Sequence, residues 1–451
     1  MRRIWAVATN TIRQALRIRV ACVFVILLFV LLPALGITTT GDETLKGRLQ
    51  TFVSYGLSLT SFLLCLLTII VSVYAVTSDI DQRQIYTVIT KPIRRYQFLL
   101  GKLLGVVVLD VVLLALFCGV IYVITAYMPR LVNAPDNELI DAQNQFLTAR
   151  AALTVPVADV TQQVKEKYEE LKKQDRLPAD YTQEQIIAEL TKQAQLAQRA
   201  AGVGEALVWE FENVRPLAKS MFIRFKYDVY PNPPDSQVYG RWLAGDYQYV
   251  KHGQQVKTPI YDEVFKDAAR TFHEIEFSAE VVPEHGHLAI AFQNVPLNDT
   301  TVIFPPDGLE VLYKADSFTA NFIRAALMIL CRLVFLACLG ILASSFLSFP
   351  VAILFCLVLF FTASFSGFVI ESFDYLSANV GAVYSHTLKW AIRLLPQFDK
   401  YNPTSYIVPA RLLSWTVLAQ CAFFMVCIKG LLLLALGLLI FAYKEIARII
   451  V

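Results

Sequence analysis

Charged and polar side chains form one compact block between two apolar runs of this sequence. The block, DIDQRQIYTVITKPIRRYQFLLGKLLG, occupies residues 79–105. Asp79 and Gln82 have the spacing of a helix-capping box, and Pro92 disfavours helical structure at the residue before it. Three apolar residues between these signals share one helical face: Ile85, Val88 and Ile89. The pattern predicts a short amphipathic helix within residues 79–95, of the kind that docks onto another protein.

The residues that follow this helix have the chemistry of a membrane interface. Arg94 and Arg95 suit the depth of lipid phosphates, and Tyr96 is an interfacial anchor. Gly101 and Gly105 have GxxxG spacing, which permits close contact between helices. An ordinary basic loop explains Arg94, Arg95 and Lys102 equally well.

Three charged side chains fall inside apolar runs, namely Asp110, Arg332 and Lys429. A charge in lipid is costly, so such residues normally face a helix-bundle interior or a partner. One interpretation is a polar lining or a charge-linked gate. The interpretation that we favour is an ion pair between spans, from Asp110 to Arg332 or Lys429, which fixes helix packing.

No pattern elsewhere predicts catalysis or a metal centre. Glu284-His285-Gly286-His287 lacks a third and a fourth ligand, and a turn between strands accounts for it. Residues 253–258 lack the second glycine of a phosphate-binding P-loop. All eight cysteines fall in apolar runs without CxxC spacing, as small buried hydrophobes do. We therefore assign no catalytic residues, no metal ligands and no cofactor bound by this chain.

Composition places the chain in a membrane. Of its 451 residues, 56% are hydrophobic and only 17% are charged, whereas soluble domains have about 25% charged residues. The net charge of +3 is too small to indicate a nucleic-acid partner. Six stretches are long and apolar enough to span a lipid bilayer: 20–37, 52–76, 103–127, 322–346, 351–370 and 415–443.

Basic residues predict the orientation of these spans. They cluster before the first span, in the 79–105 block and after the last span, so these regions and both termini are predicted to be cytoplasmic. The loop after the fifth span is also basic and argues against this orientation, but three consistent regions outweigh it. At the N-terminus, arginines opposite an apolar face predict an interfacial helix with Trp5 at headgroup level, rather than a signal peptide.

A polar region of residues 128–318 separates the third span from the fourth and is large enough for one domain. At 141–201, two apolar stripes separated by a proline turn predict an antiparallel helical hairpin. At 219–316, short runs of alternating apolar and polar residues predict an antiparallel β-sandwich. The predicted fold is therefore an all-α six-helix transmembrane bundle, formed by 1–127 and 319–451, with an inserted α+β extracytoplasmic domain.

The block at 79–105 resembles the loop between the second and third spans of ABC-2-type transporter permeases. That loop runs from an acidic residue through a short helix to "L-x-x-P-x-x-R", an aromatic residue and "L-L-G-K". The segments NTIRQALR at 10–17 and Leu394-Leu-Pro396 also resemble parts of that family, and the six-span plan agrees. The resemblance covers a little over half of the chain, and the large insertion departs from the family's common form.

The resemblance implies a permease subunit that forms a homo- or heterodimer and couples to a separate nucleotide-binding ATPase, which would use ATP and magnesium. Six residues would carry that contact: Asp81, Arg83, Gln84, Tyr86, Thr87 and Lys91. The resemblance also implies a multi-pass protein of the bacterial cytoplasmic (inner) membrane that exports or extracts an unidentified substrate.

Three other functions fit parts of the sequence. In the first, ATPase-driven movement of the helices is transmitted to an envelope partner without transport. In the second, a sandwich tethered by helices acts as a binding module without energy input. The third is a membrane enzyme, which would need a catalytic polar cluster within the spans, and the sequence shows none there beyond the three charges named above. Copurification of an ATPase separates the permease and the force-transmitting protein from the binding module.

Overall fold

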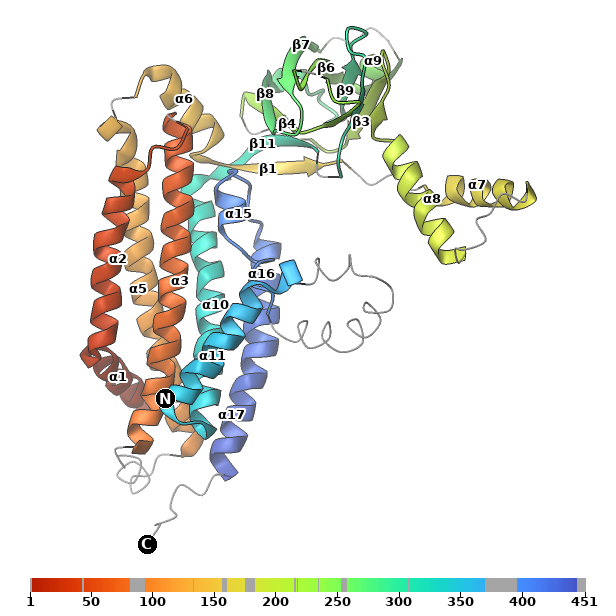
Figure 1. The fold of residues 1–451 in the computed structure, drawn as a ribbon. Coiled ribbons are helices and arrows are strands. Elements are labelled where there is room, and N and C mark those ends of the chain that lie inside the picture. Colours follow the sequence, from red (N-terminus) through yellow and green to blue (C-terminus); the bar gives the residue numbers. More distant parts are fainter. Residues whose placement is uncertain are drawn as a thin grey trace. The chain divides into compact units, whose positions relative to one another are not determined.

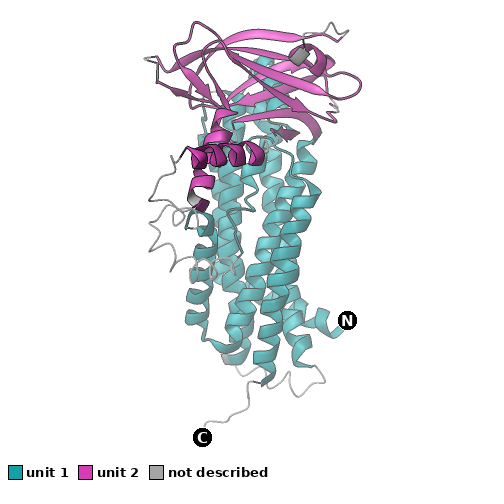
Figure 2. Ribbon diagram, turned by 90° about the vertical axis from the view of Figure 1, so that its right-hand side faces the viewer, with its two compact units in different colours: residues 1–149, 316–451 teal, residues 150–315 magenta. Residues whose placement is uncertain are grey.

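The structure, a computed structural model, describes residues 2–42, 44–81, 94–132, 134–155, 160–174, 183–214, 216, 218–233, 235–252, 258–306, 308–369 and 396–443. The chain divides into two compact units (Figure 2). The helical unit comprises Met1–Ala149 and Asp316–Val451, and the β unit comprises Arg150–Ala315.

Among the described residues, the helical unit contains five helices long and apolar enough to cross a membrane (Figure 1). They are α2 (Arg19–Thr38), α3 (Leu45–Asp81), α5 (Arg95–Val132), α10 (Phe318–Phe346) and a last span that begins at Trp415. The last span consists of α16 (Trp415–Ala422), the π-helical stretch η2 (Phe423–Gly430) and α17 (Leu431–Tyr443). The shorter helices are α1 (Arg2–Arg17), α6 (Asp136–Gln145), α11 (Phe349–Ser364) and α15 (Thr404–Ile407).

The predicted count of six spans is not confirmed. The predicted span at 351–370 corresponds to α11, whose 16 residues are fewer than the roughly 20 that a bilayer requires. Residues 370–395, which follow it, lie outside the described part of the chain. With five long apolar helices, the chain is nevertheless a multi-pass membrane protein.

The long helices differ in how much of their apolar surface the unit covers. In the most apolar part of α3, 72% of the residues are buried, and the value for α10 is 67%. The values for α2 and the last span are only 17% and 22%. A helix that is apolar on all sides but little covered by protein needs another apolar medium. Helices α3 and α10 are therefore the centre of the unit, and α2 and the last span present apolar faces to lipid or to another chain.

The predicted helix start at Asp79 is wrong. Helix α3 runs without interruption to Asp81, so that Asp79 lies in its last turn. The carboxylate of Asp79 does not cap a helix but forms an ion pair with Lys102 of α5. The side chain of Asp79 therefore pairs with a residue that is distant in the sequence and does not cap a local helix, as its spacing had predicted. Residues 82–93 lie outside the described part of the chain, and the amphipathic helix there remains a prediction.

The described part of the β unit contains three sheets, with strand orders β1-β11-β4-β8, β3-β9-β6-β7 and β2-β10-β5. Neighbouring strands pair in antiparallel fashion. Strand β4 pairs with β8 and β11, and β9 pairs with β3 and β6. The strands are β1 (Thr148–Thr154), β2 (Ala200–Ala201), β3 (Ala206–Phe211), β4 (Ser220–Phe225), β5 (Asp228–Tyr230), β6 (Gln237–Asp246), β7 (Tyr261–Ala268), β8 (His273–Ser278), β9 (Leu288–Asn294), β10 (Thr301–Ile303) and β11 (Leu309–Ser317).

The two four-stranded sheets share one hydrophobic core, which gives the inserted part its sandwich character. Alternate residues of β4 point into this core, as the alternating pattern predicted. Trp242 of β6 is fully buried there, with its ring centroid 4.4 Å from that of Phe225 and 5.1 Å from that of Phe292. The predicted start of the sandwich at residue 219 is too late, because β1 and β3 precede it. Strand β3 reads ALVWEF, a nearly continuous apolar run without the alternation on which the prediction depended.

Short helices complete the β unit. Helices α7 (Thr161–Lys173) and α8 (Gln183–Ala197) pack against each other, at the position of the predicted hairpin. The predicted range of 141–201 was too wide, because it includes β1. Two further short elements are α9 (Tyr247–His252) and the 3₁₀ turn η1 (Ala279–Val281).

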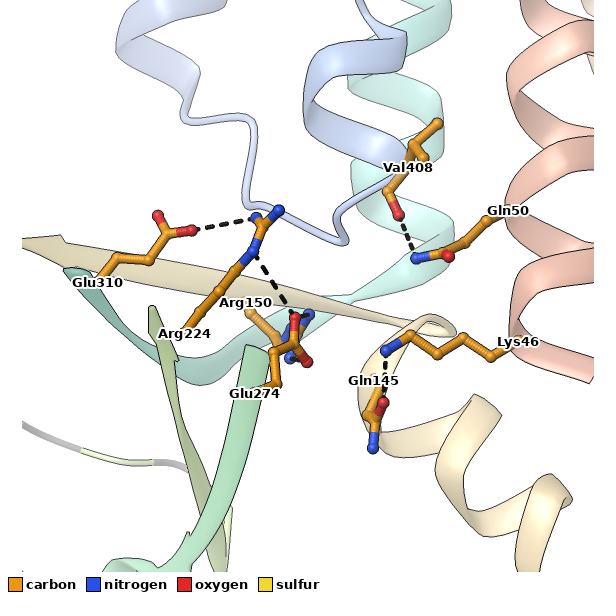
Figure 3. Close-up of polar contacts among 8 residues, drawn as sticks. All are labelled: Lys46, Gln50, Gln145, Arg150, Arg224, Glu274, Glu310 and Val408. Carbon is orange, nitrogen blue, oxygen red and sulfur yellow. Dashed lines mark hydrogen bonds and ion pairs between the residues drawn. The ribbon is translucent and has the colours of Figure 1, made fainter. Parts of the chain in front are cut away.

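A row of alternating charges crosses one of the four-stranded sheets (Figure 3). Arg224 of β4 lies directly opposite Glu310 of β11 and Glu274 of β8. Its guanidinium is 3.1 Å from the Glu310 carboxylate and 4.0 Å from that of Glu274. Arg150, which is 1% exposed, donates two hydrogen bonds to Glu274, at 3.1 and 3.2 Å. Opposite charges on neighbouring strands favour a single register, since a shift by one residue would separate them.

We predict that Trp242→Ala lowers the stability of the β unit strongly. Removing a fully buried indole should cost about 3–5 kcal/mol, because the surrounding aromatic rings cannot close the cavity. The measurement is urea unfolding of a fragment from Thr148 to Ser317, followed by circular dichroism. Val264→Ala is the control, since Val264 is 56% exposed and should change stability by less than about 0.5 kcal/mol. Equal losses in the two variants would show that the core is not centred on Trp242.

Candidate coupling site

Helix α1 lies directly on the start of α5, and two glycines make this contact possible. A Cβ atom on Gly101 would come within 2.6 Å of the Cβ of Val7, and one on Gly105 within 2.7 Å of the Cβ of Thr11. The facing side of α1 carries small residues that are almost fully buried: Ala8, Thr11 and Ala15. The close contact predicted from the GxxxG spacing is confirmed, and its partner is α1.

Beside these glycines, three polar side chains from three helices form a closed cluster. Lys102 of α5 donates to the Asp79 carboxylate of α3 at 2.6 Å and to Gln14 Oε1 of α1 at 2.9 Å. Gln14 Nε2 in turn donates to the other carboxylate oxygen of Asp79 at 3.0 Å. Lys102 is 0% exposed and Asp79 is 4% exposed. We call these three residues the Lys102 cluster.

The Lys102 cluster was not predicted from the sequence, which marked Asp79 as a helix cap and gave the nearby basic residues an interfacial role. A signal was present, since Lys102 stands alone in the run FLLGKLLGVVV. A lysine surrounded by leucines and glycines must find a carboxylate or reach water. Which carboxylate it finds depends on how α3 and α5 pack.

The start of α5 is also attached to the end of α17. Arg95 Nη1 donates to the carbonyl oxygens of Phe441 and Ala442, at 3.2 and 2.7 Å. The rings of Phe98 and Phe441 are stacked with their centroids 6.0 Å apart. Carbonyls in the last turn of a helix lack partners within it, so an arginine there both satisfies them and offsets the helix dipole.

These contacts hold α1, α3, α5 and α17 together near the end of α3 and the start of α5, the two helices that residues 82–93 connect. We call this end of the helical unit the α1 end. Arg83, Gln84, Tyr86, Thr87 and Lys91 lie outside the described residues, and Asp81 is described only as the last residue of α3. Their predicted contact with an ATPase therefore stays a prediction.

The predicted interface residues are found at the α1 end. Trp5 of α1 is 60% exposed and Tyr96 of α5 is 42% exposed, as interfacial side chains would be. Arg94 and Arg95 are also exposed, and Arg95 in addition donates to the end of α17 as described above.

Residues 5–158 match the family model of the ABC-2 family transporter protein. The resemblance to this family is confirmed over that range. The match covers α1, α2, α3 and α5, and therefore includes every residue of the Lys102 cluster. The match supports a membrane subunit of a transporter rather than a catalytic subunit. Neither the search of curated proteins nor that of solved structures gives a match.

The predicted ion pair from Asp110 to Arg332 or Lys429 is not found among the described residues. Asp110 is 1% exposed and accepts a hydrogen bond from Thr68 Oγ1 of α3 at 2.9 Å. Among the described residues, this hydrogen bond is the polar contact that its side chain makes. Arg332 instead contacts α3 at Ser61, which lies seven residues before Thr68. Two side chains separated by seven residues of helix are about 10 Å apart along its axis, so Asp110 and Arg332 occupy different levels.

Arg332 holds an irregular segment inside the helical unit. Its guanidinium donates to the carbonyl oxygens of Phe398 and Tyr401, at 2.8 and 3.3 Å, and lies 4.9 Å from the Phe398 ring centroid. Arg332 is halfway along α10, so residues 398–401 reach well into the span. Backbone without helical structure is tolerated at this depth only where protein or a polar cavity satisfies it.

Other residues hold the same segment nearer to the end of the unit. Asn321 of α10 donates to Arg411 O at 2.8 Å and accepts from Leu413 N at 2.8 Å. Gln50 of α3 donates to Val408 O at 2.9 Å (Figure 3). The two central helices therefore carry a series of polar side chains that satisfy the backbone of residues 398–413.

Lys429 lies in η2, the π-helical part of the last span, beside this segment. It lines a cavity with Gln397, Lys400 and Tyr401. The three predicted intramembrane charges therefore do not form one cluster. They lie in three separate environments, those of Asp110, Arg332 and Lys429.

In the β unit, His285 and His287 precede β9, where Gly286 adopts φ +74° in a turn. His287 is 3.8 Å from Glu210 and His285 is 4.0 Å from Asp246. Among the described residues, no three His, Cys, Asp or Glu side chains are arranged to hold a metal.

We predict that Gly105→Ala separates α1 from α5 and lowers the melting temperature of the full chain in detergent. The added methyl would meet Thr11 Cβ at 2.7 Å and the Ala8 carbonyl at 2.8 Å, and such overpacking costs about 1–3 kcal/mol. Gly119→Ala is a matched control in the same helix, because nothing lies within 4 Å of its Cβ position. That variant should be neutral or slightly stabilising. A Gly105→Ala protein as stable as the control would mean that α1 is not held at this groove.

We also predict that Lys102→Met destabilises the chain by about 3–5 kcal/mol, because it leaves the Asp79 carboxylate buried without its counter-charge. Combining it with Asp79→Leu should restore most of the loss, since an apolar pair removes the cost of burying the charge. The measurement is a double-mutant cycle of thermal unfolding on the purified chain. Simple addition of the two single effects would contradict a direct ion pair.

Proposed function

We propose that the chain is the permease subunit of an ABC transporter, working as a dimer with a separate nucleotide-binding ATPase. The observation that carries the proposal is the Lys102 cluster within the range that matches the ABC-2 transporter family. It fixes α1, α3 and α5 to one another where residues 82–93 connect α3 to α5. A force applied to that connection would act on three helices at once.

In this proposal the ATPase contacts the polar side chains of the connection, namely Asp81, Arg83, Gln84, Tyr86, Thr87 and Lys91. Movement of the connection passes to α3 and α5, and through Gly101 and Gly105 to α1. Arg95 transmits the same movement to the end of the last span. ATP and magnesium belong to the partner, which supplies the chemical step, and this chain converts the movement into a rearrangement of its spans.

The proposal includes a location. The α1 end would face the cytoplasm of a bacterium, with both chain termini, and the protein would reside in the cytoplasmic membrane. The positively charged residues before the first span and around residues 94–102 support this orientation. The β unit would then be extracytoplasmic.

A second candidate is a force-transmitting protein that moves no small-molecule cargo. It is favoured by the inserted β unit, which has a hydrophobic core of its own and could meet an envelope partner. The two candidates differ in whether ATP hydrolysis moves a solute across a sealed vesicle.

We predict that Asp81→Lys with Arg83→Glu weakens copurification of the ATPase by about tenfold, the effect of losing one charge pair at an interface. The measurement is affinity purification of the tagged chain followed by mass spectrometry of the bound proteins. A matched control exchanges Arg241 and Asp262, an exposed ion pair of the β unit, and should leave copurification unchanged. The proposal fails if the wild-type chain never brings down a nucleotide-binding protein.

A further inference from the structure

Three sulfur-bearing side chains meet between α10 and the last span. Cys421, in the last turn of α16, donates from its thiol to the thioether of Met425 in η2, and the two sulfur atoms are 3.4 Å apart. The thiol of Cys421 is also in hydrogen-bond contact with that of Cys331 in α10. We call Cys331, Cys421 and Met425 the sulfur cluster.

The sulfur cluster is enclosed by the helical unit. Cys421 is 0% exposed and Met425 is 2% exposed, whereas Cys331 is partly exposed. Helix α10 packs against both α16 and η2, which holds the three side chains together. All three lie in the described part of the chain.

The depth of the sulfur cluster limits which side chains could form a site there. Cys331 lies about 20 Å along α10 from Phe318, close to the middle of that helix. Carboxylates and other charged groups are costly at such depth in lipid. Thiols and thioethers are uncharged and behave as small apolar groups, so they can wait there for a ligand at little cost.

The three donor atoms indicate the kind of ligand. Thiolate and thioether sulfur are soft ligands, which favour copper(I), zinc and iron–sulfur clusters, whereas calcium and magnesium take oxygen ligands. Structural zinc sites use four ligands, and iron–sulfur clusters are held by four cysteines as a rule. Two thiols and one thioether therefore match copper(I) best.

The helix geometry also favours a site at this place. Cys421 and Met425 are four residues apart, so they share one face of the span. The π-helical stretch η2 begins between them, at Phe423. Such stretches occur frequently at functional sites.

Binding would change the charge of the sulfur cluster. Each thiol must lose its proton to become a ligand, so one copper(I) ion replaces two protons and the complex has a net negative charge. Arg332 follows Cys331 in α10, and its positive charge acts on Cys421 as well as on Asp399. A nearby guanidinium lowers the cost of a negative charge in this apolar surrounding.

We propose that Cys331, Cys421 and Met425 bind one copper(I) ion inside the helical unit. The third ligand is a thioether, so this site differs in kind from the groups of three His, Cys, Asp or Glu side chains that are absent among the described residues. A bound ion would join α10 to the last span. The site is formed by this chain alone and does not depend on coupling to an ATPase.

The test uses the full chain, purified in detergent without oxygen and in the presence of a thiol-free reductant. Copper(I) is added in competition with bicinchoninate, a coloured copper(I) chelator. We expect the wild-type chain to take one copper(I) ion from the chelator and to show the ultraviolet absorption of copper–thiolate bonds. Binding should also raise the melting temperature, since the ion binds the folded chain.

Cys331→Ser and Cys421→Ser should each weaken copper(I) binding by more than about 100-fold, because losing a group that merely supports a ligand already costs 10–100-fold. Met425→Leu keeps the volume and should weaken binding less, since a thioether carries no charge. Cys427→Ser is the matched control, because Cys427 is an exposed cysteine of the same π-helical stretch. Its affinity and its copper-dependent rise in melting temperature should equal those of the wild type.

The melting temperature without metal shows whether each variant still folds, and Met425→Leu tests the site even if a serine variant does not. Equal loss of affinity in the Cys427→Ser control and in the cluster variants would overturn the proposal, because binding would then be unspecific. A wild-type chain that takes no copper(I), or that binds zinc as tightly, would overturn it too. So would a disulfide between Cys331 and Cys421 in the freshly purified chain, detected by thiol labelling and mass spectrometry.

Discussion

Polar groups inside an apolar medium must find partners within the protein, and this constraint organises the helical unit. Lys102 can be buried because Asp79 and Gln14 accept hydrogen bonds from its ammonium group. Asp110 is buried against Thr68. Arg332 is used to satisfy carbonyl oxygens of a segment that has no regular structure. Each of these contacts joins a helix to another part of the unit, so the need to satisfy polar groups also determines which segments lie together.

At the α1 end, the constraint has a consequence for how movement could pass through the unit. Buried ion pairs contribute little net stability but are very costly to break. Helices joined by the Lys102 cluster should therefore move together rather than slide. The glycine groove on α5 adds a second restraint, since small residues of α1 contact it at backbone distance. The proposed coupling to an ATPase would rely on such stiffness.

The β unit has a different source of stability. Its core is made of aromatic rings from two sheets, centred on Trp242, and it contains no cysteine to supply a disulfide. The ion pair of Arg224 with Glu310 joins neighbouring strands and favours one register, and Arg150 of β1 adds an ion pair to Glu274 of β8. Such a unit can bury its own apolar surface independently of lipid.

The sequence by itself determined the apolar helices, the approximate place of the inserted part and the close contact at Gly101 and Gly105. These features follow from composition and from spacing within about twenty residues, where helix and strand periods are visible. It also gave the family resemblance, through the short block before α5. The tertiary structure alone decided the partners of the buried charges. Lys102, Asp110 and Arg332 each had several candidate partners in the sequence, and the choice among them depends on the level and rotation at which distant helices pack. Local spacing carries no information on those two quantities, which is why Asp79 was expected to cap a helix and instead neutralises a lysine on another one.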